Sequence, residues 1–168
     1  YANAATRNRA KLSVGRQTYT LNDGFLVNMV KGSANAGPRG ASYLGPRLTN
    51  DFSVLAEASI RSLSASAFYI DPDELESLES DSHYLGGNIA FAPTETLSAD
   101  ATILTVPASK SSFATPQGRR VPRQGEVTIA GHINASNILL DGLFAEGELA
   151  HQFHNGEDVS AWAGYGTL

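Results

Sequence analysis

The stretch EVTIAGHINA at residues 126–135 decides the fold, because apolar and polar side chains alternate along it. Every second position from Val127 to Ile133 carries valine, isoleucine or glycine, and polar side chains such as Thr128 and His132 stand between them. An amphipathic helix would need apolar residues three and four positions apart, whereas successive residues of a strand point to opposite faces of a sheet. The stretch therefore predicts a β-strand with one apolar and one polar face.

The same period of two recurs along the chain, for example in residues 52–61 and 97–106. Antiparallel strands joined by short connections are the simplest arrangement for such a series, and they allow the two faces of one sheet to differ in polarity. We predict nine strands, at residues 10–20, 25–31, 52–61, 63–70, 83–91, 97–106, 125–135, 139–153 and 159–168.

The low fraction of charged residues is typical of strands that hide half of their side chains from water. Charged residues make up 17% of the 168 residues, whereas soluble domains contain about 25%. No apolar run approaches the roughly 20 residues of a transmembrane helix. The absence of cysteine excludes disulfides, thiolate metal ligands and a thiol nucleophile. A net charge of −5 argues against nucleic acid as a partner.

The connections between the predicted strands alternate in length. Tight connections are expected at residues 22–24, 61–63, 93–95 and 136–137, and long ones at residues 32–51, 71–81 and 107–124. Transmembrane β-barrels have short periplasmic turns and longer extracellular loops, and their strands need about 9–11 residues to cross a bilayer. We therefore predict an all-β, antiparallel, up-and-down transmembrane β-barrel whose apolar side chains contact lipid and whose polar side chains line the lumen.

The expected domain organisation is a single barrel segment over residues 1–168, with eight to nine strands. Bacterial single-chain barrels use even strand numbers, and the sequence stops within a predicted strand without a terminal aromatic residue. It also starts at Tyr1 and shows no secretory signal. We therefore expect a fragment, or the ordered part, of a larger barrel.

Four strings along the chain resemble one family of bacterial outer-membrane proteins. They are GRQTYTLNDGFL at residues 15–26, SASAFYIDP at 64–72, GELAHQ at 147–152 and AWAGY at 161–165. In order and spacing they are similar to segments of the alginate export family, although residues 107–124 match no part of its pattern. The resemblance implies a monomeric, porin-like barrel that passes anionic polysaccharide, such as alginate, or other small polar solutes.

Charged residues on the predicted lumen face are the candidate site. Arg7, Arg9 and Lys11 lie two apart and form a positive ladder on one strand, which would favour an anionic solute. Acidic residues on later strands would complete a transverse field that orients dipolar or zwitterionic solutes, although pairing between neighbouring strands is an equal alternative. The predicted pore-lining residues are Arg7, Arg9, Lys11, Arg16, Glu57, Arg61, Asp100, Glu126, His132, Glu146 and Glu148.

Other chemistry finds little support in the sequence. The acidic segment at residues 71–81 lacks the ligand spacing of an EF-hand, and His151 and His154 are expected to diverge. Neither Gly-x-Ser-x-Gly nor His-Glu-x-x-His occurs. We therefore predict no catalytic residues, no metal site and no cofactor.

The predicted function is passive passage of polar solutes across the bacterial outer membrane. The expected partners of the barrel are outer-membrane lipid and lipopolysaccharide. The alternative is a soluble or surface-exposed β-sandwich that binds a partner or a glycan. Burial of the apolar side chains distinguishes the barrel from the sandwich. In the barrel they would be exposed, and in the sandwich they would be buried. These residues are Val54, Ala56, Ile60, Val127, Ile129, Ile133, Ala145 and Leu149.

Overall fold

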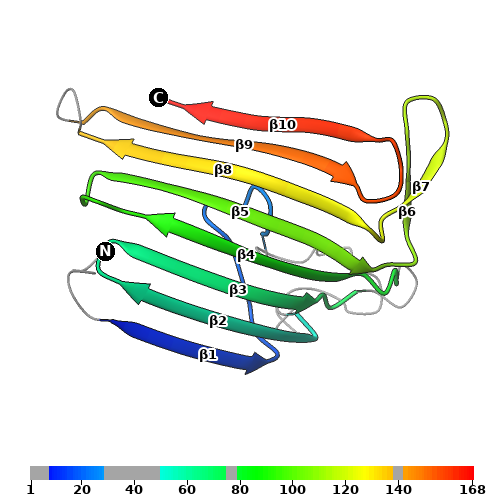
Figure 1. The fold of residues 1–168 in the computed structure, drawn as a ribbon, viewed down its shortest axis with the longest axis horizontal. Coiled ribbons are helices and arrows are strands. Elements are labelled where there is room, and N and C mark those ends of the chain that lie inside the picture. The colour runs from blue at the N-terminus through cyan, green and yellow to red at the C-terminus, as the bar shows by residue number, and fades with distance from the viewer. Residues whose placement is uncertain (1–7, 29–49, 75–78, 138–141) are drawn as a thin grey trace, which may run out of the picture.

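The computed structural model describes residues 8–28, 50–74, 79–137 and 142–168, and these form one large antiparallel sheet (Figure 1). Eight strands lie in the order β1-β2-β3-β4-β5-β8-β9-β10, so each strand pairs with its neighbour in the sheet and the sequence runs back and forth across it. The strands are β1 (Arg9–Gly15), β2 (Phe52–Ile60), β3 (Leu63–Asp71), β4 (His83–Phe91), β5 (Leu97–Ala108), β8 (Glu126–Ser136), β9 (Phe144–His154) and β10 (Ser160–Thr167).

The predicted all-β antiparallel sheet is confirmed, and eight of the nine predicted strands are present in whole or in part. The strand expected at residues 25–31 is wrong over its described part, because residues 25–28 form no strand. The first strand ends at Gly15, where φ is +119°, instead of continuing to Thr20. A small hairpin of β6 (Ser112–Ala114) and β7 (Arg120–Pro122) was not predicted.

Apart from the turn at residues 22–24, the described connections lie at the ends of the sheet that the alternation of loop lengths predicts. The turns after β2, β4 and β8 lie together at one end of the sheet (Figure 1, left), and Arg61 and Asn137 adopt positive φ in two of them. The β6–β7 hairpin and the connection after β3 lie at the other end. The predicted loop positions Pro38 and Glu76 fall outside the described residues.

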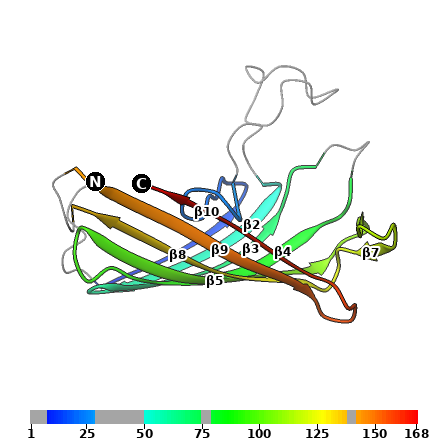
Figure 2. The same cartoon turned by 90° about the horizontal axis from the view of Figure 1, so that it is seen from above.

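The sheet is curved into an open trough rather than closed into a barrel (Figure 2). Its edge strands are β1 and β10, and they do not pair with each other in the described part of the chain. Residues 16–28, which we call the strap, lie on the concave side. Among the described residues, no helix is long and apolar enough to cross a membrane.

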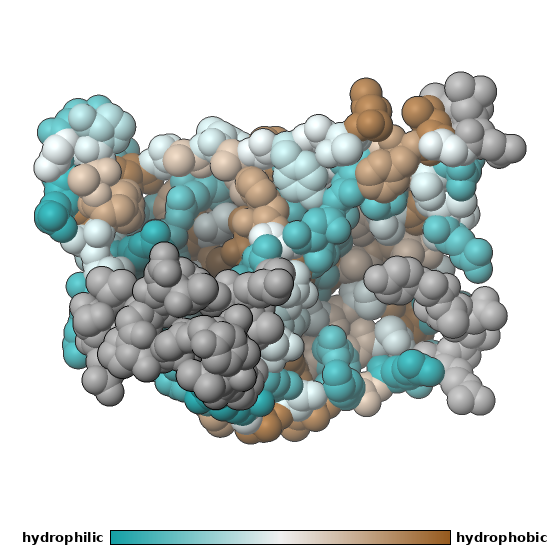
Figure 3. All heavy atoms as spheres, turned by 180° about the vertical axis from the view of Figure 1, so that it is seen from behind, coloured by the Kyte–Doolittle hydropathy of each residue, from teal (hydrophilic) through white to brown (hydrophobic). Residues whose placement is uncertain are grey.

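The two faces of the trough differ sharply in polarity. The convex face exposes large apolar side chains, including Leu12, Ile103 and Ile129. Polar side chains gather on the concave side, which is hollowed (Figure 3). None of the eight apolar residues predicted to face outward is buried: Ala56, Ile60, Ile129, Ile133 and Leu149 are exposed, and Val54, Val127 and Ala145 are half-buried.

A small apolar core holds one half of the strap against the sheet. Leu21 of the strap packs with Leu55, Phe68 and Ile70 on the concave face, and the Tyr19 ring lies 4.9 Å from the Phe68 ring. A Cβ at position 86, where the chain has glycine, would lie 2.3 Å from Phe68 Cζ. Glycine is therefore needed there for the Phe68 ring to approach β4 this closely.

The strap folds back on itself at the turn predicted for residues 22–24. Gly24 N donates to the Leu21 carbonyl at 2.9 Å, and Leu21 N donates to the Val27 carbonyl at 3.0 Å. The prediction that this turn joins two strands at the end of the sheet is wrong, because it lies over the concave face. Leu21 enters the apolar core, and the next two side chains reach polar groups instead.

Candidate functional site

Strand register places four polar residues in one row across the concave face. Asp100 on β5 lies opposite His132 on β8, which lies opposite Glu148 on β9, which in turn lies opposite Tyr165 on β10. Directly paired residues of antiparallel strands point to the same face, with Cβ atoms about 5 Å apart. The row thus concentrates two acids, one imidazole and one phenol within four neighbouring strands.

His132 is the centre of this cluster. Its Nδ1 lies 2.9 Å from Asp100 Oδ2, and its Nε2 lies 3.3 Å from Glu146 Oε1 and 3.5 Å from Asp23 Oδ2. Only 9% of the imidazole side chain is exposed. Both ring nitrogens therefore face carboxylate oxygens in a region with little access to water, which orients the ring firmly.

The strap completes the cluster from the opposite side. Asn22 Nδ2 donates to Asp100 Oδ1 at 2.9 Å. The Tyr165 hydroxyl lies 2.8 Å from Glu146 Oε1 and 3.2 Å from Asp23 Oδ2, and it has one hydrogen to donate between these two oxygens. The contacts of Asn22 and Asp23 connect the strap to β5 and β10, and Tyr165 also reaches Glu146 on β9. Together with the apolar core around Phe68, they fix the strap at two points across the width of the trough.

Asp100 is the most heavily hydrogen-bonded acid of the cluster. In addition to its contacts with the strap and with His132, it accepts a bond of 2.8 Å from Asn88 Nδ2, which also donates to Thr102 Oγ1 at 2.8 Å. Hydrogen bonds from neutral donors stabilise a buried carboxylate. Asp100 is thus held in one orientation, with its second oxygen directed at the imidazole.

The predicted pore-lining residues separate into two groups on the concave wall. Asp100, His132, Glu146 and Glu148 meet on β5, β8 and β9, as described above. Arg9, Lys11 and Glu57 lie on β1 and β2, and Lys11 Nζ is 3.2 Å from Glu57 Oε2. Glu126 lies on the same face near the long-loop end of β8 and accepts a hydrogen bond from Gln152. Arg7 lies outside the described residues.

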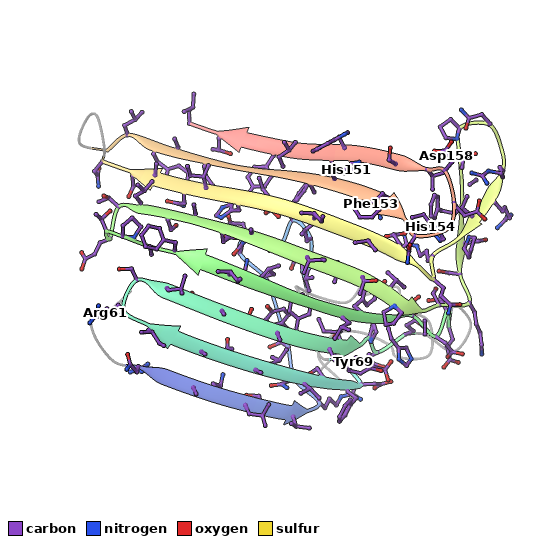
Figure 4. All side chains as sticks on the ribbon, viewed as in Figure 1. Arg61, Tyr69, His151, Phe153, His154 and Asp158 are labelled. Carbon is purple, nitrogen blue, oxygen red and sulfur yellow. The ribbon has the colours of Figure 1, made fainter. Side chains whose placement is uncertain are left out.

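Two predicted residues lie elsewhere. Arg61 is in the exposed turn after β2, at the end of the sheet (Figure 4). Arg16 is the first residue of the strap, and its guanidinium is 2.7 Å from Asp51 Oδ1 and 2.8 Å from Asp73 Oδ2. Arg16 therefore connects the strap to the chain segments that flank β2 and β3 and does not stand on the wall.

The histidines outside the cluster do not join it. The His151 ring lies on the convex face, stacked 4.3 Å from the Trp162 ring, and His154 Nε2 lies 2.8 Å from the Gln124 carbonyl oxygen (Figure 4). His83 Nδ1 lies 2.5 Å from the Tyr69 hydroxyl, near the long-loop end of the sheet. His132 is thus the one histidine that the fold surrounds with carboxylates among the described residues.

Sequence reasoning missed the contributions of Asn22, Asp23, Asn88 and Tyr165. The alternation along β10 was visible, but the register that brings Tyr165 opposite Glu148 was not. The sequence predicts only a tight turn between two strands for Asn22 and Asp23, because asparagine, aspartate and glycine are the usual turn residues. The polar strap residues between Leu21 and Phe25 were the available signal for a segment that lies across a mixed apolar and polar surface.

Comparison with known proteins gave no match. No family model, curated protein or solved structure matches the chain. The resemblance to the alginate export family therefore stays a prediction, and the function is argued from the geometry alone.

Proposed function

We propose that the chain is part of a β-barrel in the bacterial outer membrane that passes small polar solutes, without catalysis, along its concave face. The observation that carries the proposal is the convex face. In the described strands this face holds no lysine, arginine or glutamate, and its one aspartate is Asp71 at the end of β3. A solvated sheet normally carries charges on its outer face, whereas lipid requires their absence.

A soluble sandwich would need a second sheet to cover the same surface. Two packed sheets bury their apolar faces against each other at about 10 Å. The other sheet in the described part of the chain is the β6–β7 hairpin, whose strands have three residues each. It is too small to cover eight strands, so lipid is the better partner for the convex face.

The concave face supports a route for polar or zwitterionic solutes. Arg9 and Lys11 stand on β1, while Asp100, Glu146 and Glu148 stand on the strands at the other side of the trough. Opposite charges on opposing walls produce a field across the lumen, and this field orients a dipolar solute. The strap lies in the same space and narrows it, as inward-folded segments do in other barrels.

The direct test is the behaviour of the whole chain in membranes. It should require detergent for extraction from outer-membrane fractions, and the detergent-purified, complete barrel that contains the chain should produce stepwise ion conductance in planar lipid bilayers. Extraction by carbonate at high pH without detergent would support the soluble alternative. Membrane retention without conductance would leave the membrane location but contradict the channel.

Passage of an anionic polysaccharide is the more specific form of the proposal, and it depends on Arg9 and Lys11. Replacing both with glutamine should lower the anion-to-cation permeability ratio several-fold. The loss should be largest at low salt, because the Debye length is about 30 Å at 0.01 M and screening is weak. The ratio is measured from reversal potentials across bilayers with a salt gradient.

The matched control for that experiment is Arg61→Gln, which removes a positive charge from the turn after β2 instead of from the wall. It should leave the permeability ratio close to that of the unchanged chain. An unchanged ratio in the Arg9→Gln, Lys11→Gln double variant would remove the residue-level argument for an anionic solute.

A further inference from the structure

Three side chains of the His132 cluster have the spacing of metal ligands. Asp23 Oδ2, His132 Nε2 and Glu146 Oε1 all lie within 4.8 Å of one another. The imidazole nitrogen is 3.5 Å from the first oxygen and 3.3 Å from the second. Ligands that each stand about 2.1 Å from one metal ion lie about 3.0–3.5 Å from one another. The two distances from the imidazole nitrogen thus match the spacing of ligand atoms that share one metal ion.

Glu148 is a second, independent observation that points to a cation at this place. Its residue surface is 4% exposed, and its Oε2 atom has no hydrogen-bond partner among the described residues. It lies directly opposite His132 in the register of β8 and β9 and points to the same face. A buried carboxylate oxygen without a partner is costly, so it indicates a ligand.

The charge balance of the cluster also favours a cation. Asp23, Asp100, Glu146 and Glu148 surround one imidazole, and within the described residues none of these four acids is paired with lysine or arginine. An ion pair on the same face, between Lys11 and Glu57, lies away from the cluster on β1 and β2. The four acids outnumber the one imidazole, and a divalent ion would offset part of their negative charge.

The hydrogen bond between Asp100 and His132 Nδ1 leaves His132 Nε2 as the nitrogen that faces the proposed metal position. Asp100 occupies His132 Nδ1, and metal-binding histidines typically hold their second nitrogen against a carboxylate in this way. Nε2 then faces the two oxygens from Asp23 and Glu146. Imidazole combined with carboxylate suits zinc, manganese, iron or cobalt, whereas calcium and magnesium prefer oxygen alone.

We propose that Asp23, His132 and Glu146 bind a divalent transition-metal ion, with Glu148 beside the ion and Asp100 orienting the imidazole. The ion would connect the strap to β8 and β9, since Asp23 belongs to the strap. The Tyr165 hydroxyl lies within hydrogen-bond distance of both carboxylates and would help to position them. The inference goes beyond the proposed channel and does not depend on transport.

Calorimetric titration of the metal-stripped whole chain in detergent, with Zn²⁺ as the probe, tests this site. The unchanged chain should bind one ion. Asp23→Asn and Glu146→Gln should each weaken binding at least tenfold, because each removes one charged ligand. Titration with Ca²⁺ should show much weaker binding, since one of the three ligands is nitrogen.

Two control variants exclude adventitious binding. Glu57→Gln removes a carboxylate of the same concave face outside the cluster, and His154→Gln removes a histidine near the long-loop end; both should bind like the unchanged chain. Asp23 lies outside the strands, so its variant should retain the β-type circular dichroism spectrum even if Glu146→Gln does not fold. Absence of one-to-one binding by the folded, unchanged chain would overturn the proposal, and so would equal affinities of the Asp23→Asn and Glu57→Gln variants.

Discussion

Replacement of Ile129 with lysine is expected to cost about 2–4 kcal/mol of the free energy of unfolding in a lipid bilayer, the range for a basic residue on the lipid face near the midplane. Ile129 lies mid-strand on β8, between Ile103 and His151 on the neighbouring strands, and is 49% exposed. If the convex face met water, the same change would alter stability by no more than about 0.5 kcal/mol, as is usual for surface positions.

The measurement is reversible urea unfolding of the chain refolded into phosphatidylcholine vesicles, followed by fluorescence of Trp162. The control is Gln117→Lys, which introduces the same charge in the exposed turn of the β6–β7 hairpin. It should change the free energy of unfolding little in the same vesicles. If the two lysine variants were equally stable, lipid would not be the partner of the convex face.

Replacement of Phe68 with alanine is expected to cost about 3–5 kcal/mol and to detach the strap. Phe68 is 2% exposed and lies between Leu21 of the strap and Gly86 of β4. Removal of a buried phenylalanine costs about that amount because it loses the transfer free energy and leaves a cavity. Gly86 has no side chain that could fill the space.

Two measurements test this expectation. Urea unfolding in vesicles gives the loss of stability, and limited trypsin digestion with mass spectrometry gives the rate of cleavage after Arg16, at the start of the strap. Phe91→Ala is the control, because Phe91 is on the convex face near the tight-turn end and is 51% exposed. Faster cleavage after Arg16 in both variants would show that strap docking does not depend on the Phe68 core.

Strands in which apolar and polar residues alternate clearly could be predicted from the sequence. The strand β4 has the predicted bounds, His83 to Phe91, and the apolar faces of β2 and β8 point outward as expected. The two three-residue strands of the β6–β7 hairpin are too short for alternation to be visible. The strap contains the end of one predicted strand, a predicted tight turn and the start of a second predicted strand, but Phe25 contacts the Tyr165 ring and Val27 packs against the apolar core instead of pairing in the sheet.

The candidate site was predictable in its parts but not as a whole. Alternation alone placed His132, Glu146 and Glu148 on one face, since each occupies a polar position of its strand. Their contact with Asp23 depends on how the strap crosses the trough, and that path is set by packing of Leu21 against Phe68. Sequence periodicity reports which face a side chain takes and carries no information about what lies above that face.

The two anchor points of the strap imply an order of folding. Its apolar half meets β2 and β3, which follow it closely in the chain, so this contact needs only the first hairpin. Its polar half contacts segments that are distant in the chain. Asn22 is hydrogen-bonded to Asp100, 78 residues away, and Asp23 is hydrogen-bonded to Tyr165, 142 residues away. Contacts between neighbouring strands of a meander form early because the loops they close are short, and contacts across long stretches of chain form late. The apolar half of the strap should therefore dock on the sheet first. The contact between Asp23 and Tyr165 should form later, when β10 pairs with β9.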